Sequence, residues 1–318
     1  MTKVFSMFSG IGGFELGLLM SEKNVKLVGY SEIDKYAIEV FQKRFKGINN
    51  YGNATIIDET KLPNFDLLVG GFPCQAFSVA GRQRGFDDTR GTLFFDVARI
   101  LKHKKPKHFI LENVRGLLSH DSGRTFQTII KVLADIGYLV QWEVCNSKNY
   151  GVPQSRERMY IVGHLRGQSR PKVFSFREGN GVSETSRKKE RERSSQVSST
   201  ITSNYKRGTH AMGEQYILEP KELTKNIGQG QRVYSTNGAS VSIKALGGGQ
   251  GGKTGLYKIR QGKTQIRRLT PIECERLQGF PDNWTEGLSD TQRYKCMGNA
   301  VTTNVVEWVV TQLYKKEK

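Results

Sequence analysis

The sequence predicts an α/β fold in which a doubly wound sheet carries a second, smaller, loop-rich domain. Apolar runs of strand length alternate with segments of helical period from residue 3 to residue 165. A glycine-rich turn, Ser9-Gly10-Ile11-Gly12-Gly13, separates the first predicted strand from the first predicted helix. The composition then changes near Arg166, where a polar and basic stretch begins. Such alternation is typical of sheets covered by helices on both faces.

The first half of the chain supplies the elements of this sheet. Short apolar runs predict strands, and a 3.6-residue period predicts helices, as for Phe126, Ile129 and Leu133. Strands are expected at residues 3–8, 27–30, 66–69, 108–111, 138–144 and 158–165, and helices at 14–20, 35–45, 93–101 and 125–136.

The second half is less regular. Residues 166–207 are polar and basic, a composition found more often in a solvated linker than in a binding face. Glycine-rich segments follow between residues 228 and 262, and they are expected to form short strands and loops. We therefore predict a first domain at 1–172 that is completed by 297–318, a loop-rich domain at 173–266, and a hinge segment at 267–296.

Two helices are expected near the C-terminal end. Thr270, Pro271 and Glu273 have the order of an N-cap, a first helical position and a capping-box acid. Val305, Val309 and Leu313 then define the buried face of a closing helix, which we expect to return to the first domain.

The charge of the chain indicates its class of partner. Lys and Arg exceed Asp and Glu by 49 to 30, giving a formal net charge of +19 that favours nucleic acid or an anionic membrane. No apolar stretch approaches the ~20 residues that span a bilayer, so an intracellular, membrane-free protein is expected. The four cysteines are far apart and form no CxxC pair, so neither disulfides nor a metal site are predicted.

Several residues of chemical interest fall at predicted strand ends. Cys74 follows a buried strand, Gly70-Gly71 and Pro73, which makes it a candidate nucleophile, although a free cysteine is often only packed in a core. Glu112 ends a neighbouring strand, where most glutamates are simply solvated. Arg156 and Arg158 would hold a phosphate or orient a base, and a surface ion pair with Glu157 is the ordinary alternative.

The glycine turn predicts a nucleotide-type cofactor. Gly10 and Gly12 allow a ligand to approach the backbone at a helix N-terminus. Glu32 follows the second strand, where an acid can accept hydrogen bonds from a ribose. These residues alone leave a dinucleotide and S-adenosylmethionine equally open. The segment 79–92, with three glycines and three arginines, suits either a mobile basic lid or a solvated loop.

Six motifs taken together resemble one family. Phe8-Ser9-Gly10-Ile11-Gly12-Gly13, Gly71-Phe72-Pro73-Cys74-Gln75, Glu112-Asn113-Val114, Gln154-Ser155-Arg156-Glu157-Arg158, Leu277-Gln278-Gly279-Phe280-Pro281 and Gly298-Asn299-Ala300-Val301 stand in its order and approximate spacing. The chain closely resembles the bacterial DNA cytosine-5 methyltransferases of type II restriction-modification systems. The resemblance implies a Rossmann-like, S-adenosylmethionine-dependent catalytic domain and a small target-recognition domain.

Catalytic roles follow from this resemblance and agree with the chemistry. A thiolate that adds to carbon 6 of cytosine makes carbon 5 nucleophilic, which is the role implied for Cys74. A carboxylic acid at the ring nitrogen N3 assists, and Glu112 is the candidate. Arg156 and Arg158 would hold the base carbonyl and a nearby phosphate, and would help to keep the thiol ionised.

The resemblance also implies the binding residues. Around the cofactor, Phe8 and Ile33 would sandwich the adenine, Glu32 would bind the ribose, and the pocket would be completed by Gly10, Gly12, Asn53, Pro73, Leu93 and Asn299. DNA contacts are expected from Ser78, Arg82, Gln229 and Arg232. Two positions depart from the family pattern: Asn53 replaces an acid that faces the adenine amino group, and Ala80 replaces a serine that helps to fill the space left by the flipped base.

The implied function is methylation of a short GC-containing palindrome in double-stranded DNA, with the target cytosine flipped out of the duplex. A cytoplasmic monomer, encoded by a bacterium or a phage, is expected to protect DNA from a cognate restriction endonuclease. Three alternatives remain at this point: a tRNA cytosine-5 methyltransferase, an inert DNA-binding relative, and a dehydrogenase. The dehydrogenase leaves Cys74 and the basic second domain without a role.

Overall fold

The computed structural model describes residues 1–73, 93–169, 171–174, 222–223, 233–235, 239–243, 256–261 and 263–315. The chain forms two compact units, and each is discontinuous in sequence. The first unit comprises 1–145, 157–174 and 306–318, and the second comprises 146–156 and 175–305. Residues 146–156, which the predicted limits include in the first domain, therefore cluster with the second unit.

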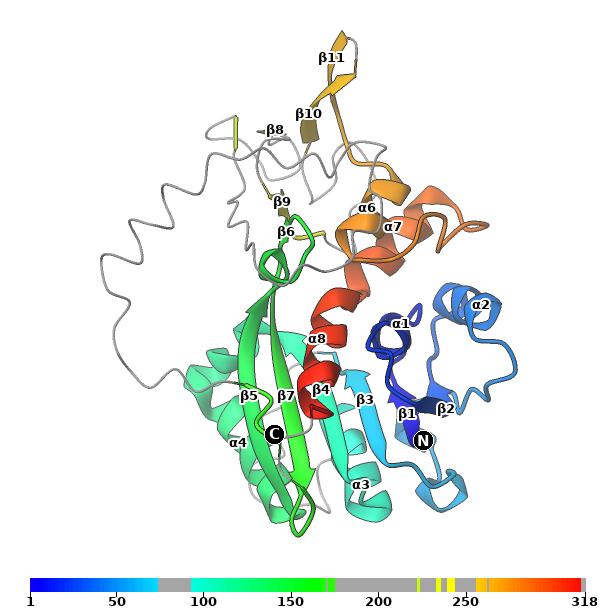
Figure 1. Ribbon diagram of the computed structural model, residues 1–318, viewed down its shortest axis with the longest axis vertical. Coiled ribbons are helices and arrows are strands. Elements are labelled where there is room, and N and C mark those ends of the chain that lie inside the picture. The colour runs from blue at the N-terminus through cyan, green and yellow to red at the C-terminus, as the bar shows by residue number, and fades with distance from the viewer. Residues whose placement is uncertain are drawn as a thin grey trace. The chain divides into compact units, whose positions relative to one another are not determined.

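The first unit is built on a six-stranded sheet (Figure 1) with the order β2-β1-β3-β4-β7-β5. Parallel pairs join β1 to β2, β1 to β3 and β3 to β4, whereas β4 and β7 are antiparallel. The strands are β1 (Thr2–Met7), β2 (Val25–Ser31), β3 (Leu67–Gly71), β4 (His108–Val114), β5 (Tyr138–Asn146) and β7 (Glu157–Leu165). Because β2 and β3 lie on opposite sides of β1, the sheet has a switch point at the carboxyl end of β1, where ligands commonly bind.

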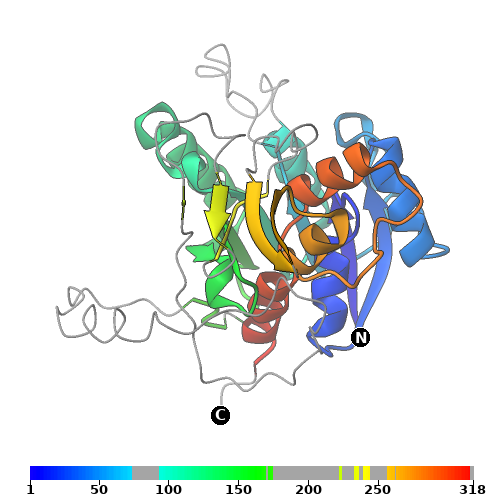
Figure 2. The same cartoon turned by 90° about the horizontal axis from the view of Figure 1, so that it is seen from above.

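Helices cover both faces of this sheet. Seen from above, α1 and α8 lie on one side and α3 and α4 on the other (Figure 2). The helices are α1 (Gly13–Met20), α2 (Lys35–Arg44), α3 (Leu93–Lys104), α4 (Arg124–Asp135) and α8 (Thr303–Leu313), and 3-10 turns occur at Ala54–Ile56, Glu59–Lys61, Arg115–Leu118, His120–Gly123 and Ser147–Asn149. The predicted doubly wound α/β fold is confirmed.

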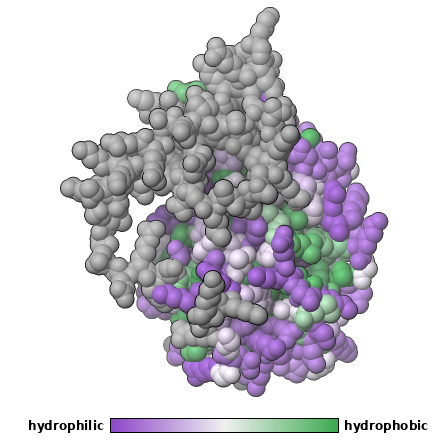
Figure 3. All heavy atoms as spheres, in the orientation of Figure 1, coloured by the Kyte–Doolittle hydropathy of each residue, from purple (hydrophilic) through white to green (hydrophobic). Residues whose placement is uncertain are grey.

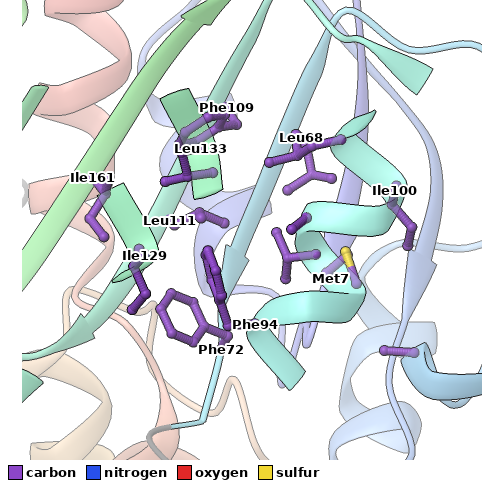
Figure 4. Packing of buried hydrophobic residues seen from close by; sticks show 14 of the residues in the cluster. Met7, Leu68, Phe72, Phe94, Ile100, Phe109, Leu111, Ile129, Leu133 and Ile161 are labelled. Atoms are coloured by element: carbon purple, nitrogen blue, oxygen red, sulfur yellow. The ribbon is translucent and has the colours of Figure 1, made fainter. Parts of the chain in front are cut away.

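Alternate strand residues supply the core between the sheet and the pair α3 and α4. Leu68, Phe109 and Leu111 are fully buried and pack with Ile129 and Leu133 of α4 (Figure 4). Burying such a side chain contributes about 1.5–3 kcal/mol. This layer fixes the strands whose carboxyl ends carry the candidate catalytic residues.

The described residues of the second unit form two small sheets and two helices. Strands β8 (Val233–Ser235), β10 (Leu256–Gln261) and β11 (Lys263–Arg267) form one sheet, and β6 (Gln154–Ser155) pairs with β9 (Ser240–Val241) in the other. The Tyr257 hydroxyl group links the two sheets, lying 2.7 Å from Ser240 Oγ and accepting a 3.1 Å bond from Val241 N.

The helices of the second unit are α6 (Pro271–Leu277) and α7 (Asp290–Asn299). The predicted capping box of α6 is confirmed, because Thr270 Oγ1 accepts from Glu273 N and the Glu273 carboxylate accepts from Thr270 N.

The C-terminal end of β4 differs from the prediction, and this end carries Glu112. The sequence predicts that the strand before Glu112 ends at Leu111, but β4 continues to Val114. Its last residues pair with the first residues of β7, so that Glu112 faces Tyr160 and Val114 faces Arg158 in the antiparallel register. Glu112 is therefore held by a strand rather than by a loop.

The outer surface agrees with the polar composition. In the described part of the view in Figure 3, hydrophilic residues predominate and hydrophobic residues form scattered patches. Among the described residues, no helix has the length and apolar character needed to cross a membrane.

Candidate active site

The chain that leads to Cys74 is anchored in the core. β3 ends at Gly71, and Phe72 is buried with its ring centroid 5.6 Å from that of Phe94 near the start of α3. The carbonyl group of Phe72 accepts a 2.8 Å hydrogen bond from Asn113 Nδ2. Cys74 itself lies outside the described residues, but its approach is tied to both neighbouring elements.

Glu112 and Arg158 form a partly enclosed ion pair at the same sheet edge. Glu112 is 9% exposed, and its Oε1 lies 3.0 Å from Arg158 Nε. In the sheet, Glu112 is the register partner of Gly71, three residues before Cys74. Arg158 NH1 also donates to the carbonyl group of Glu157, at 2.8 Å, which restricts the guanidinium further. The structure thus brings together two of the four predicted catalytic residues.

The glycine turn lies at the carboxyl end of β1, next in the sheet to β3. Phe8, Gly10 and Gly12 have φ values of 53°, 56° and 88°. Helix α1 starts after Gly12 without a side-chain cap, so its first N–H groups are not satisfied by a capping side chain. This arrangement suits a ligand that carries negative or acceptor groups.

Glu32 connects the glycine turn to the end of β2. Its Oε2 accepts from Gly10 N at 2.8 Å, and its Oε1 accepts from Ile33 N at 2.7 Å and Asp34 N at 2.9 Å. A carboxylate offers about four acceptor positions, so these three bonds leave one position on Oε2. Ile33 is 69% exposed beside it and can cover an apolar ring. These residues fit an adenosine group.

Comparisons with known proteins agree with this geometry. The profile of the family described as C-5 cytosine-specific DNA methylase matches residues 2–315. The chain belongs to this family. A DNA methylase of this family takes its methyl group from S-adenosylmethionine, so the predicted activity and cofactor are confirmed.

Curated relatives match this methylase over almost its whole length. Type II methyltransferase M1.ScrFI of Lactococcus lactis subsp. cremoris is 39% identical, over 98% of this chain and 77% of its own. Type II methyltransferase M.HhaI of Haemophilus parahaemolyticus is 38% identical, over 96% of this chain and 92% of its own.

Solved structures share the fold of the methylase. A DNMT2 variant from Spodoptera frugiperda superimposes with a TM-score of 0.72 at 17% identity, covering 99% of this chain and 100% of its own. Dnmt2 of S. pombe gives a TM-score of 0.69 at 18% identity, covering 98% of both chains.

Arg156 of the methylase has a different environment from Arg158. It is buried in the second unit, where its NH1 donates to Ile243 O at 3.0 Å and its NH2 donates to Gly298 O at 3.1 Å and Ala300 O at 2.9 Å. These carbonyl groups accept from the guanidinium N–H groups that the sequence analysis expects to bind a base or a phosphate. The predicted catalytic role of Arg156 stays a prediction, and the geometry favours a positioning role.

The remaining cofactor residues lie at the ends of elements. Asn53 precedes the turn Ala54–Ile56, and its Oδ1 accepts from Thr55 N at 3.1 Å and Thr55 Oγ1 at 3.0 Å. Pro73 is the last described residue before Cys74, and Leu93 is the first residue of α3. Asn299 is the last residue of α7 and belongs to the second unit.

Several predicted sites lie outside the described residues, namely Cys74, Ser78, Ala80, Arg82, Gln229 and Arg232. Their predicted roles stay predictions. Within the described ranges there is no group of three or more His, Cys, Asp or Glu residues that could hold a metal ion.

The sequence interpretation missed four polar residues that organise these sites. Asn113 stands within a family motif and has no predicted role, although it ties Phe72 to β4. In the second unit, Gln154 Nε2 donates to Leu277 O at 2.8 Å and Gln278 Nε2 donates to Met297 O at 2.9 Å. Their presence in the family motifs was the available indication. Asn50, which bonds to Glu32, lies in no motif.

Proposed function

We propose that this methylase transfers a methyl group to carbon 5 of a flipped cytosine in a short GC-containing palindrome of double-stranded DNA. The observation that carries the proposal is the Glu112–Arg158 ion pair of 3.0 Å, at the strand position beside Gly71, on the strand that leads to Cys74. It concentrates an acid, a cation and the approach to a thiol at one sheet edge.

Cys74 is the nucleophile. Its thiolate adds to carbon 6 of the cytosine, and the electron pair of the 5,6 double bond becomes available at carbon 5. S-adenosylmethionine supplies the methyl group as a sulfonium donor. Breaking of the sulfur–methyl bond leaves the neutral thioether S-adenosylhomocysteine. Transfer of the carbon 5 proton to water then restores the double bond and expels the Cys74 thiolate.

Glu112 stabilises the addition by holding a proton at the ring nitrogen N3. Arg158 fixes the carboxyl group through Nε, and its guanidinium also offers donors to the carbonyl oxygen of the base. Asn113 holds the Phe72 carbonyl, two residues before Cys74, and so fixes the chain that leads to the nucleophile.

Cofactor binding uses the carboxyl ends of β1 and β2. Gly10 and Gly12 admit the ligand to the backbone, and Glu32 accepts one ribose hydroxyl group through its remaining Oε2 position. Phe8 and Ile33 cover the adenine ring, while Pro73 and Leu93 complete the pocket within the first unit.

DNA binding relies on the basic composition and on the second unit. A net charge of +19 attracts the phosphate backbone, and contacts of this kind offset the few kcal/mol needed to flip a base. Ser78, Arg82, Gln229 and Arg232 contact the DNA, and Gln229 fills the space left by the flipped cytosine.

The names of the relatives support a biological role in restriction and modification. Two of them are named type II methyltransferases and come from bacteria, and an orphan methyltransferase comes from Bacillus phage SPR. We infer that this chain works as a monomer on DNA in the cytoplasm, and that it protects its target from a restriction endonuclease without binding that enzyme.

Glu112→Gln tests the proposal directly. We expect kcat on duplex DNA to fall by about 100-fold or more, the usual range for loss of a general acid, with binding of S-adenosylhomocysteine retained. Glu157→Gln is the matched control, because Glu157 is adjacent to Arg158 but pairs with the exposed Arg115. Equal loss in both variants, or methyl transfer to tRNA in preference to duplex DNA, would contradict the proposal.

A further inference from the structure

One asparagine side chain pairs with both backbone polar groups of Glu32. Asn50 Oδ1 accepts from Glu32 N at 3.2 Å, and Asn50 Nδ2 donates to Glu32 O at 3.1 Å. The same Oδ1 accepts from Gly52 N at 2.9 Å. The amide therefore fixes Glu32, the residue that directly follows β2, and also fixes the turn before Asn53.

The backbone around Asn50 continues the sheet for one residue pair. Tyr30 N donates to Asn49 O at 3.0 Å, and Tyr51 N donates to Tyr30 O at 2.7 Å, which makes a parallel bridge between Tyr30 and Asn50. Ser31 Oγ donates to Gly52 O at 2.7 Å. β2 ends at Ser31, so the Asn50 side chain supplies to Glu32 the pairing that a neighbouring strand would supply.

The carboxylate of Glu32 depends on this placement. Its oxygens accept from Gly10 N, Ile33 N and Asp34 N, which belong to the glycine turn and to the entry of α2. Hydrogen bonds weaken steeply outside a narrow range of distance and angle. A shift of the Glu32 backbone would therefore move the one remaining acceptor position on Oε2.

We propose that Asn50 is a positioning residue for the ribose of S-adenosylmethionine and that it acts through Glu32. The proposal rests on the proposed role of Glu32 in cofactor binding. Asn50 holds the backbone of Glu32 from one side while Gly10 holds its carboxylate from the other. The ribose hydroxyl group then meets an acceptor whose position is set before binding.

The test is a calorimetric binding series with S-adenosylhomocysteine and its 2′-deoxy and 3′-deoxy analogues. The wild type should lose about tenfold or more in affinity for at least one deoxy analogue, the size expected for a hydrogen bond to a charged acceptor. Asn50→Ala should bind S-adenosylhomocysteine about tenfold more weakly and should reduce the deoxy penalty to about two- to threefold. Asn49→Ala is the control and should match the wild type. Asn49 is an exposed neighbour, and its bond to Tyr30 N is made by its backbone carbonyl group.

Each outcome decides a different claim. A deoxy penalty that stays at the wild-type value in Asn50→Ala overturns the role of Asn50, because a merely structural loss weakens all three ligands alike. A wild type without any deoxy penalty instead contradicts the role of Glu32 in the proposed function. If circular dichroism shows that Asn50→Ala is unfolded, Asn50→Asp serves, since it keeps the acceptor for Glu32 N and loses the donor to Glu32 O.

Discussion

At the scale of single residues, hydrogen bonds from Thr55 determine which polar group of Asn53 is left for a ligand. Its Oδ1 accepts from both Thr55 N and Thr55 Oγ1, so the group left for a ligand is the Nδ2 donor. The adenine amino group is also a donor. Because its oxygen is bonded to Thr55, Asn53 is a poor substitute for the acid that faces the adenine amino group in the family pattern.

Asn53→Asp should therefore strengthen cofactor binding. One carboxylate oxygen keeps the cap on Thr55, and the other can accept from the adenine amino group. We expect S-adenosylhomocysteine to bind about three- to tenfold more tightly, as measured by titration calorimetry. Unchanged or weaker binding by Asn53→Asp would show that adenine does not contact this side chain.

The catalytic residues were predictable to different degrees. Glu112 and Arg158 follow from motif order, and the structure places them 3.0 Å apart. The environment of Arg156 was not predictable, because its partners Ile243, Gly298 and Ala300 are distant in sequence and are brought together only by folding. A motif gives the residue type, whereas the acceptors around a guanidinium depend on tertiary structure.

At the scale of elements, helix α1 contains a buried acid. Glu15 lies in the first turn of α1 and is 3% exposed. Burial raises the pKa of Glu15 from 4.5 to about 7, and neither oxygen of its carboxyl group has a hydrogen-bond partner among the described residues. The folded state therefore favours the protonated acid.

This predicts a loss of stability with rising pH. Because the pKa is higher in the folded state, the contribution of Glu15 is most favourable below its unfolded value of 4.5 and declines as pH rises to about 7. The free energy of unfolding of Glu15→Gln, relative to that of the wild type, should rise by on the order of 3 kcal/mol between pH 4.5 and pH 8. Urea unfolding of both proteins at these pH values measures the difference, and a constant difference would contradict the assignment.

Strands β4 and β7 contain a hydrogen-bonded pair of histidines. Its expected effect on the pH dependence of stability is opposite to that of Glu15. Gln141 Oε1 accepts from Val173 N, so its Nε2 is the donor to His164 Nε2 at 2.9 Å. His164 therefore carries its proton on Nδ1 and donates to His108 Nδ1 at 3.0 Å. Burial, followed by the charge of Lys107, lowers the pKa of His108 to about 4.

Acid should therefore destabilise this region. Since the folded pKa of His108 lies below its ordinary value of 6.5, the stability that it contributes is present above pH 6.5 and is lost as pH falls toward 4. His108→Asn retains an acceptor but has no titrating ring. Its free energy of unfolding should therefore fall by about 2 kcal/mol less than that of the wild type between pH 7.5 and pH 5. Parallel urea unfolding curves at the two pH values would show this, and equal sensitivity would refute it.

At the scale of the whole molecule, the two units differ in how well sequence patterns predict them. The strands and helices of the first unit follow apolar periodicity, and the predicted segments agree with the structure apart from their ends. The antiparallel pairing of β7 with β4 was not apparent, because it depends on sheet order rather than on any local pattern. The strands described in the second unit are short and carry too few apolar residues to show a period.

The unit to which residues 146–156 belong also depends on tertiary contacts that no local pattern indicates. This segment is continuous with β5 and β7, so sequence alone assigns it to the first domain. In the structure, Gln154 and Arg156 bond to Leu277, Ile243 and Ala300 of the second unit. Buried polar bonds such as these are costly to break, so the segment is part of the second unit's core.

We propose that Cys74 is the nucleophile for cytosine methylation in duplex DNA. The measurement that tests it most directly is bisulfite sequencing of plasmid DNA from cells that express the wild type or Cys74→Ser, in a host without cytosine methylation of its own. We predict that every cytosine at one position of a single short motif is protected by the wild type and that none is protected by Cys74→Ser. Protection by both proteins would contradict the assignment of the nucleophile, and protection by neither would contradict the assignment of duplex DNA as the substrate.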